Sequence, residues 1–333
     1  MQSCDYLRSY LTNRNQLVKI GKIKSDWLTL KTGVPQGSVT GPLLFNIFIN
    51  DFIFLLQNEC DVFNYADDNT LSFSHHNPSQ IKLTLEHASR TALCWFKNNY
   101  MKANTSKFQA ICFSKDDISI QYEIDGSKVN SESTVKLLGV HIDRKLTFSH
   151  HVSVICKKAA RQINVLQRLC KYFDFSTKMR IYESFIVSNF LYCSVVYDAF
   201  IITNDRKIEK LNERALRLVC NDYLSTYKQI LSQSKKSMLY ILRKYGLVEQ
   251  VFKILNGTSF PVKPSFFKIQ CTPYSMRDNM KLMKPRYNTV QYGYKSISYQ
   301  GALLWNNLPV NVKRTQDIQE FKNLLVKCNI FNA

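Results

Sequence analysis

The segment from Cys60 to Ser74 places two adjacent carboxylates, Asp67 and Asp68, at the turn of a predicted β-hairpin. Like charges this close destabilise one another, and a divalent cation between them relieves the repulsion. Because the oxygen ligands have no His or Cys beside them, Mg²⁺ or Mn²⁺ is favoured over zinc. A solvated turn is the simpler interpretation, since Asp and Asn are common turn residues.

A glycine-rich segment upstream favours the metal-site interpretation. In the sequence Gly33-Val-Pro-Gln-Gly-Ser38, two glycines bracket a proline, which predicts a rigid turn that a ligand can approach closely. Pro42 then lies in the first turn of a predicted helix. Residues 43–52 are apolar almost all round, so we expect this helix to be buried in a sizeable core. A glycine-rich loop before a buried helix, then a hairpin with paired aspartates, is typical of nucleotide-handling proteins.

With these motifs, the chain resembles the reverse transcriptases of non-LTR (LINE-type) retrotransposons. Gly33–Ser38 is similar to the motif that lines the template and the incoming nucleotide, and Tyr65-Ala-Asp-Asp68 is similar to the catalytic hairpin of a polymerase palm. The resemblance continues through the lysine-bearing segment that ends at Lys107 and through Val135–Asp143, which is similar to the primer-grip hairpin. Group II intron enzymes share the first two motifs, but Ser38 and the later segments fit the non-LTR group better.

The resemblance implies an RNA-directed DNA polymerase that transfers nucleotides by a two-metal mechanism. Asp67 and Asp68 would then be the catalytic residues and the ligands of Mg²⁺ or Mn²⁺, and the partners would be an RNA template, a DNA primer and deoxynucleoside triphosphates. The residues expected at the nucleotide and template are Gly33, Pro35, Gln36, Gly37, Ser38, Tyr65 and Lys107, and those expected in the primer grip are Leu138 and Gly139. Two simpler alternatives stay open: Tyr65 fills the apolar face of the hairpin, and Lys107 is an unpaired surface lysine.

One expected residue is missing from the sequence. Two-metal transfer needs carboxylates on both sides of the ion pair, and in the resembled family a third aspartate comes from an earlier strand. Met1–Arg14 resembles the helix after that strand, and only Asp5 and Asp26 precede the glycine-rich segment. We expect Asp26 in the turn of a hairpin that pairs residues 16–20 with 27–31. We therefore interpret the chain as an N-terminally truncated fragment that lacks the fingers and the first catalytic aspartate.

Two alternatives follow from the missing aspartate. The chain is a non-catalytic, nucleic-acid-binding relict of a retroelement, or a partner chain supplies the fingers and the aspartate. The charge distribution supports a nucleic-acid partner in each case. The formal net charge is +20, and residues 1–150 contain 16 basic and 14 acidic residues against 29 and 11 in residues 151–333. Such asymmetry predicts that the second half contacts a polyanion.

Two predicted helices concentrate this charge. In the helix His150–Phe173, apolar residues recur at three- and four-residue steps, and the opposite face carries Lys157, Arg161, Arg168 and Lys171. By resemblance, this helix belongs to a thumb that holds the nucleic-acid backbone through phosphate contacts. The helix Asp205–Tyr223 repeats the pattern with Lys207, Lys210, Arg214 and Arg217. A merely solvated basic face is the alternative for each helix.

The fold class expected is α+β. Residues 1–147 are interpreted as a partial right-hand polymerase palm, an antiparallel sheet with helices. Residues 148–256 are interpreted as a mainly α-helical thumb, and residues 257–333 as a linker and C-terminal tail with a last helix near residues 317–328.

The rest of the sequence predicts an intracellular protein of the nucleus or cytoplasm. None of the ten cysteines forms a Cys-x-x-Cys pair, which is typical of reduced core residues. No signal segment follows Met1. The one apolar span, Ile181–Ile202, carries Glu183, Asn189 and Asp198, so we expect a buried helix and no membrane partner.

Overall fold

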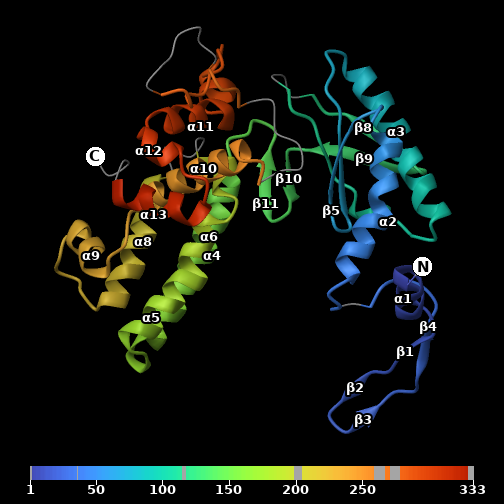
Figure 1. The fold of residues 1–333 in the computed structure, drawn as a ribbon, viewed down its shortest axis with the longest axis horizontal. Helices are drawn as coiled ribbons and strands as arrows, with labels where there is room; N and C mark the ends of the chain where they lie inside the picture. The colour runs from blue at the N-terminus through green and yellow to red at the C-terminus, as the bar shows by residue number, and fades with distance from the viewer. Residues whose placement is uncertain are drawn as a thin grey trace. The chain divides into compact units, whose positions relative to one another are not determined.

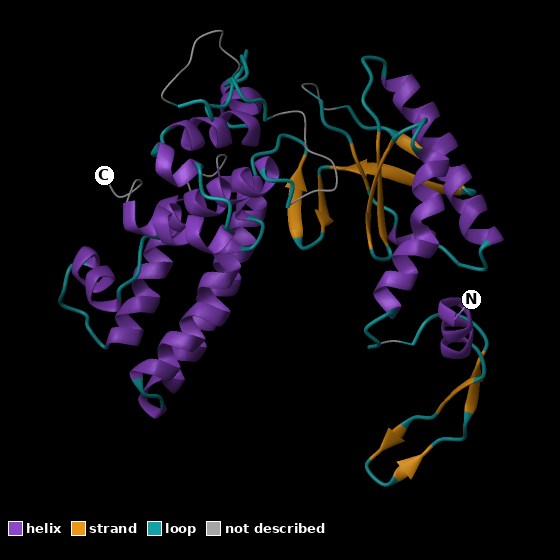
Figure 2. Cartoon of the chain, in the orientation of Figure 1, coloured by secondary structure: helices purple, strands orange, loops and turns teal. Residues whose placement is uncertain are grey.

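The computed structural model describes residues 2–35, 37–114, 118–198, 205–258, 267–270 and 278–328. These residues form two compact units. Unit 1 comprises the described residues up to Cys112 and from 118 to Glu132, and unit 2 comprises Phe113, Ser114 and the described residues from Ser133 onward. Helices alternate with small sheets (Figures 1 and 2), which confirms the mixed α and β content expected.

Among its described residues, unit 1 contains three α-helices and nine β-strands in four small sheets. In chain order they are α1 (Gln2–Leu11), β1 (Arg14–Gln16), β2 (Lys19–Ile20), β3 (Ile23–Lys24), β4 (Leu28–Leu30), α2 (Gly41–Leu56), β5 (Asp61–Tyr65), β6 (Asp68–Ser72), α3 (Pro78–Asn98), the 3₁₀ turn η1 (Thr105–Lys107), β7 (Ala110–Ile111), β8 (Gln121–Ile124) and β9 (Ser127–Glu132). Strands β1 and β4, β2 and β3, and β5 and β6 pair antiparallel, and β9 lies between β7 and β8.

The core of unit 1 is smaller than the sequence predicts. One side of α3 packs with α2 and the β5–β6 hairpin around Phe52, Leu56 and Trp95, and its other side packs on β8 and β9. The prediction that α2 is buried all round is wrong. Leu43 and Ile47 on its other side are 61% and 64% exposed, because only one face of the helix has a partner in the described residues.

The first hairpin also differs from its prediction. Its outer pairing joins Arg14–Gln16 to Leu28–Leu30, and its inner pairing joins Lys19–Ile20 to Ile23–Lys24. The tip is therefore Gly21, whose φ is +60°, a conformation that glycine adopts without strain. Asp26 lies between the two pairings and not in the turn.

Unit 2 is mainly helical in its described residues and begins with a hairpin. In chain order its elements are β10 (Thr134–Leu137), β11 (Val140–Asp143), α4 (Ser149–Leu169), η2 (Cys170–Tyr172), α5 (Phe175–Ile181), the π-helical turn η3 (Tyr182–Val187), α6 (Ser188–Leu191), α7 (Ser194–Tyr197), α8 (Asp205–Cys220), α9 (Tyr227–Ser234), α10 (Leu239–Leu255), the π-helical turn η5 (Val290–Tyr294), α11 (Ile297–Asn306), α12 (Val310–Lys313) and α13 (Ile318–Cys328).

The predicted helix faces of unit 2 are confirmed. The predicted apolar stripe of α4 is buried from Val152 to Leu166, and that of α8 packs into the same core. The apolar span from Ile181 forms η3, α6 and α7 inside this core, up to Asp198; residues 199–202 lie outside the described residues. None of the described helices is long and apolar enough to cross a membrane.

The C-terminal elements are built into unit 2. Helices α10, α11 and α13 share a core around Trp305 and Phe321, and the predicted last helix is α13. Phe267 and Leu282 from the predicted linker are buried in this core as well. Part of the linker lies outside the described residues, but the described pieces pack as core and do not act as a spacer.

Candidate functional site

The two aspartates lie at the tip of a regular hairpin in unit 1. Strands β5 and β6 pair from Asp61 opposite Ser72 to Tyr65 opposite Asp68. The connecting turn is therefore Ala66 and Asp67, and Ala66 has a φ of +52°. A two-residue turn with positive φ at its first position matches the right-handed twist of paired strands. The predicted hairpin is confirmed, with Asp67 in the turn and Asp68 as the first residue of β6.

The register assigns each residue to one face of the hairpin, since opposite residues share a face. Val62 and Leu71 form an opposite pair that packs on the core. Tyr65 and Asp68 form an opposite pair on the other face, where the Tyr65 side chain is 67% exposed. Tyr65 therefore does not fill the packed face. The open face presents an aromatic ring and a carboxylate side by side to a ligand.

Two asparagines that the sequence analysis missed hold this turn. The Nδ2 group of Asn64 donates to Oδ1 of Asn69 across the hairpin at 2.7 Å and to the carbonyl oxygen of Ala66 at 3.1 Å. Nδ2 of Asn69 donates to the carbonyl oxygen of Asp67 at 3.2 Å. Both turn carbonyls thus accept side-chain bonds, which fixes the backbone that carries the carboxylates.

The glycine-rich loop has the conformation that its sequence predicts. Gly33 and Gly37 have φ values of +85° and +80°. Oγ of Ser38 donates to the carbonyl oxygen of Pro35 at 2.7 Å and accepts from N–H of Gly41 at 3.1 Å. Ser38 therefore closes the loop and satisfies one free N–H at the start of α2. Gln36 lies outside the described residues.

Helix α2 connects this loop to the hairpin and brings them to the same end of unit 1. The loop precedes the N-terminus of α2, and strand β5 returns along α2 after a short connection. The hairpin tip therefore points back toward the end of the helix where the loop begins (Figure 1). The sequence places both motifs on elements that are packed together through Phe52 and Val62.

Lys107 ends the 3₁₀ turn η1, which Asn104 caps through the N–H of Ser106. Its side chain is exposed, and it forms no salt bridge with any residue that the structure describes. The predicted role of Lys107 beside the hairpin carboxylates stays a prediction.

The predicted primer-grip residues belong to unit 2. Leu138 and Gly139 form the two-residue turn between β10 and β11, with φ values of +46° and +85°. The hydroxyl of Tyr192 donates to the carbonyl oxygen of Leu138 at 2.7 Å, and a Cβ at position 139 would lie 3.5 Å from Cε1 of Tyr192. Tyr192 thus supports the tip of this hairpin, a contact that sequence spacing gave no means to predict.

The predicted cations of α4 all lie on its exposed side. They are Lys157, Arg161, Arg168 and, in η2, Lys171. None of them forms a salt bridge with a residue that the structure describes. Lys171 lies over the ring of Tyr172, 4.9 Å from its centroid. Because these charges are uncompensated, this face of α4 attracts anions.

The described residues contain no group of three or more His, Cys, Asp or Glu side chains arranged to hold a metal ion. The two exposed carboxylates at the hairpin tip provide oxygen donors of the kind that Mg²⁺ and Mn²⁺ prefer. No Lys or Arg among the described residues pairs with either of them.

Comparison with known proteins finds a family that part of this chain matches. Residues 1–142 match the family described as reverse transcriptase (RNA-dependent DNA polymerase). Among similar proteins of Drosophila melanogaster, the probable RNA-directed DNA polymerase from transposon BS is 27% identical over 225 residues, and that from transposon X-element is 26% identical over 221 residues. The RNA-directed DNA polymerase from mobile element jockey is 26% identical over 224 residues. No solved structure gives a significant match.

The loop and the hairpin both lie within residues 1–142, the part of the chain that matches this family. The chain is thus similar to reverse transcriptases over residues 1–142 and to polymerases of transposable elements over about two thirds of its length. Each alignment covers 64% of this chain, but the chain spans only about a quarter of the length of these relatives, from 24% to 25%.

Proposed function

We propose that the chain contributes the catalytic hairpin and the nucleic-acid contacts of an RNA-directed DNA polymerase. The observation that carries the proposal is the open hairpin tip, where Asp67 and Asp68 stand exposed on a backbone fixed by Asn64 and Asn69. Rigid placement of charged groups is what phosphoryl transfer requires of a protein.

The residues take distinct roles in this proposal. Asp67 and Asp68 would hold Mg²⁺ or Mn²⁺, which when bound activates the primer hydroxyl and stabilises charge on the phosphates. Tyr65 would contact the sugar or base beside them, and the backbone of Gly33–Ser38 would border the base pair. Further metal ligands would come from outside the hairpin, either from the phosphates or from a carboxylate that a partner chain supplies.

Lys107, Leu138 and Gly139 complete the proposed polymerase site. Lys107 would stabilise the charge of the leaving pyrophosphate, and the Leu138–Gly139 turn would contact the primer. Both assignments rest on the resemblance and on the exposure of these residues. In the proposed architecture, residues 1–147 serve as palm, residues 148–256 as thumb, and residues 257–333 as an additional C-terminal element.

A second candidate function is nucleic-acid binding without chemistry. The uncompensated cations of α4 favour it, because they do not depend on the hairpin carboxylates. Binding of this kind would be salt-dependent and indifferent to sequence.

Primer extension on an RNA template separates the two candidates. The wild-type chain is compared with a D67N/D68N variant and with Asp61→Asn, which removes one exposed carboxylate from the base of the same hairpin. The polymerase proposal predicts Mg²⁺-dependent extension that D67N/D68N abolishes and Asp61→Asn retains. Binding without extension in all three, even after addition of a chain that carries the family's fingers region, would support the second function and contradict the first.

A further inference from the structure

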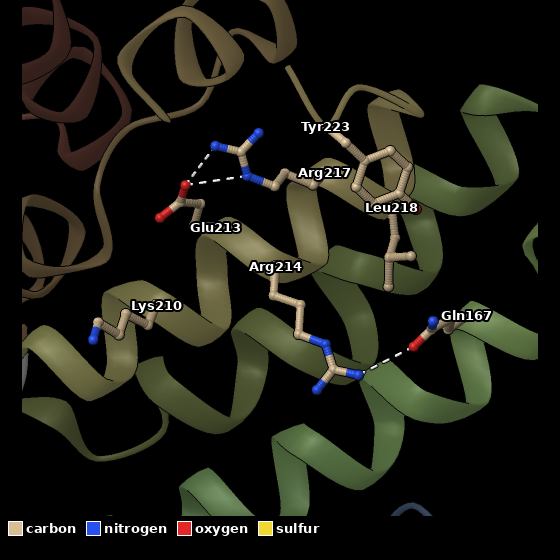
Figure 3. A pocket seen from close by; sticks show the side chains of 7 residues that line it. All are labelled: Gln167, Lys210, Glu213, Arg214, Arg217, Leu218 and Tyr223. Carbon is tan, nitrogen blue, oxygen red and sulfur yellow. Dashed lines mark hydrogen bonds and ion pairs between the residues drawn. The ribbon is translucent and has the colours of Figure 1, made fainter. Parts of the chain in front are cut away.

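Helices α4 and α8 enclose a cavity of about 250 Å³ on the surface of unit 2 (Figure 3). Its lining consists of Gln167 of α4, five residues of α8 and Tyr223 just beyond α8. Sites for small molecules typically have volumes of about 300–1,000 Å³. The cavity is therefore better suited to one group of a larger ligand than to a whole small molecule.

The cavity carries a net positive charge. Its charged residues are Lys210, Arg214, Arg217 and Glu213. Glu213 is occupied by Arg217, whose Nη2 and Nε donate to one carboxylate oxygen at 2.6 and 3.1 Å. This pair is neutral as a unit, so Lys210 and Arg214 account for the remaining charge.

Arg214 is held in place without being neutralised. Its Nη2 donates to Oδ1 of Asn164 at 2.8 Å and to Oε1 of Gln167 at 3.1 Å. Figure 3 shows Arg214 extending from α8 toward Gln167, whereas Arg217 turns to Glu213. Both acceptors are neutral amides, so Arg214 keeps its full charge. Its Nη1 and Nε have no hydrogen-bond partner among the described residues, and such a fork of donors is suited to phosphate oxygens.

The cavity also adjoins the basic face of α4. Residues 157, 161, 164, 168 and 171 follow one another at three- and four-residue steps, so they share one side of α4 and the turn after it. Asn164, which binds Arg214, thus lies between Arg161 and Arg168 on this face. The hydrogen bond from Arg214 to Asn164 thus joins the cavity to the face of α4 that carries the cations.

We propose that this cavity binds a backbone phosphate of a nucleic-acid strand, with Arg214 and Lys210 as its ligands. Tyr223, which is 61% exposed, and Leu218 provide an apolar wall for the adjoining sugar or base. The strand would continue along the basic face of α4. The site deepens the proposed function and rests on it for the choice of a nucleic acid, but its ligands lie apart from the hairpin.

The test is binding of a fluorescent RNA–DNA hybrid by the full chain, followed by anisotropy over a range of salt concentrations. Loss of one phosphate contact lowers the salt slope by about 0.9 and the affinity about fivefold at 0.15 M salt. We expect these changes for both Arg214→Gln and Lys210→Gln. Glu213→Gln should tighten binding because it removes the negative charge from the cavity.

Arg206→Gln is the matched control. Arg206 is an exposed arginine of α8 that does not line the cavity, and distant exposed charges are largely screened at this salt concentration. Equal effects of Arg206→Gln, Arg214→Gln and Lys210→Gln would overturn the proposal. If Arg214→Gln unfolds because it loses its bonds to α4, Lys210→Gln carries the test, because the Lys210 side chain forms no hydrogen bond with a described residue.

A second experiment asks whether the cavity binds a free anion or a phosphate of a nucleic-acid strand. Inorganic phosphate replaces chloride at constant ionic strength, and its binding is compared with that of the hybrid. Phosphate that binds at Arg214 while hybrid affinity is unchanged in Arg214→Gln would overturn the proposal. Primer extension on the same samples separates this inference from the proposed function. If hybrid binding depends on Arg214 but no chain extends the primer, only the polymerase proposal is contradicted. If Arg214→Gln binds the hybrid and extends the primer as well as wild type does, only the phosphate site is contradicted.

Discussion

The side chain of Asn64 donates a hydrogen bond of 2.7 Å to that of Asn69 across the β5–β6 hairpin. Asn64 and Asn69 form the next pair of opposite residues after Tyr65 and Asp68, one residue further from the turn. They therefore lie on the packed face of the hairpin and support the turn from that side. Together the two amides bond the carbonyl oxygens of Ala66 and Asp67. The position of the candidate catalytic carboxylates therefore depends on the hydrogen bonds of Asn64 and Asn69.

The Asn64 bridge predicts a measurable loss of stability. Asn64→Ala removes two hydrogen bonds, which together are worth about 1–3 kcal/mol in the free energy of unfolding. Urea denaturation measures the loss, and Ser72→Ala at the exposed base of the hairpin is the control. Equal stability of the two variants would show that the bridge does not hold the turn.

Ala66 predicts the opposite effect. Ala66 has a φ of +52°. A residue with a Cβ loses about 1–2 kcal/mol of stability in this conformation, whereas glycine does not. Ala66→Gly should therefore raise the free energy of unfolding, offset in part by the greater entropy of the unfolded chain. Ala66→Val should lower it. Thermal unfolding of both variants tests the turn, and the reverse order of stability would contradict its geometry.

The close contact between Gly41 and Ser38 predicts a coupled pair of substitutions. A Cβ at position 41 would lie 2.7 Å from Oγ of Ser38 and 3.3 Å from the carbonyl oxygen of Pro35. Gly41→Ala should cost about 1–3 kcal/mol in stability. In a Ser38→Ala background the Oγ atom of residue 38 is absent, so the loss of stability caused by Gly41→Ala should be smaller. Additive effects in this double-mutant cycle would contradict the packing of the loop on α2.

Buried His151 predicts a pH dependence in unit 2. Burial, together with the nearby His141 and His150, lowers its pKa from 6.5 to about 4, and its ring also packs on Tyr197. The folded protein thus binds fewer protons at this ring than the unfolded chain. The contribution of His151 to the free energy of unfolding is fully present above about pH 6.5 and is lost as the pH falls toward 4. This contribution is at most about 3 kcal/mol.

Comparison of variants isolates this contribution. Burial also raises the pKa of Asp205 to about 6, which gives stability a pH dependence of opposite sign in an overlapping range. His151→Asn should therefore remove part of the loss that wild type shows between pH 6.5 and 4.5, whereas His76→Asn at an exposed position of unit 1 should not. Parallel urea-denaturation profiles for wild type and His151→Asn would contradict the assignment.

Sequence patterns predicted the parts of this fold that depend on local periodicity. The stripes of α4 and α8 alternate clearly between apolar and polar faces, so they identified the buried sides. The pattern of α2 has no such contrast, and only its neighbours decide that Phe52 is buried while Ile47 is exposed. The bridge from Asn64 to Asn69 follows only once the turn is placed at Ala66 and Asp67, because the predicted turn at Asp67 and Asp68 would not set these two residues opposite each other. The contact of Tyr192 with Leu138 was not, because it joins residues 54 positions apart.

Binding of Mn²⁺ to the hairpin tip tests the central claim most directly. Electron paramagnetic resonance, in the presence of a deoxynucleoside triphosphate, would compare bound Mn²⁺ in wild type, D67N/D68N and Asp61→Asn. The account predicts that wild type and Asp61→Asn bind more Mn²⁺ than the nucleotide alone does, and that D67N/D68N loses this excess. Equal Mn²⁺ binding by all three chains would contradict the proposal that Asp67 and Asp68 are the metal ligands of a polymerase site.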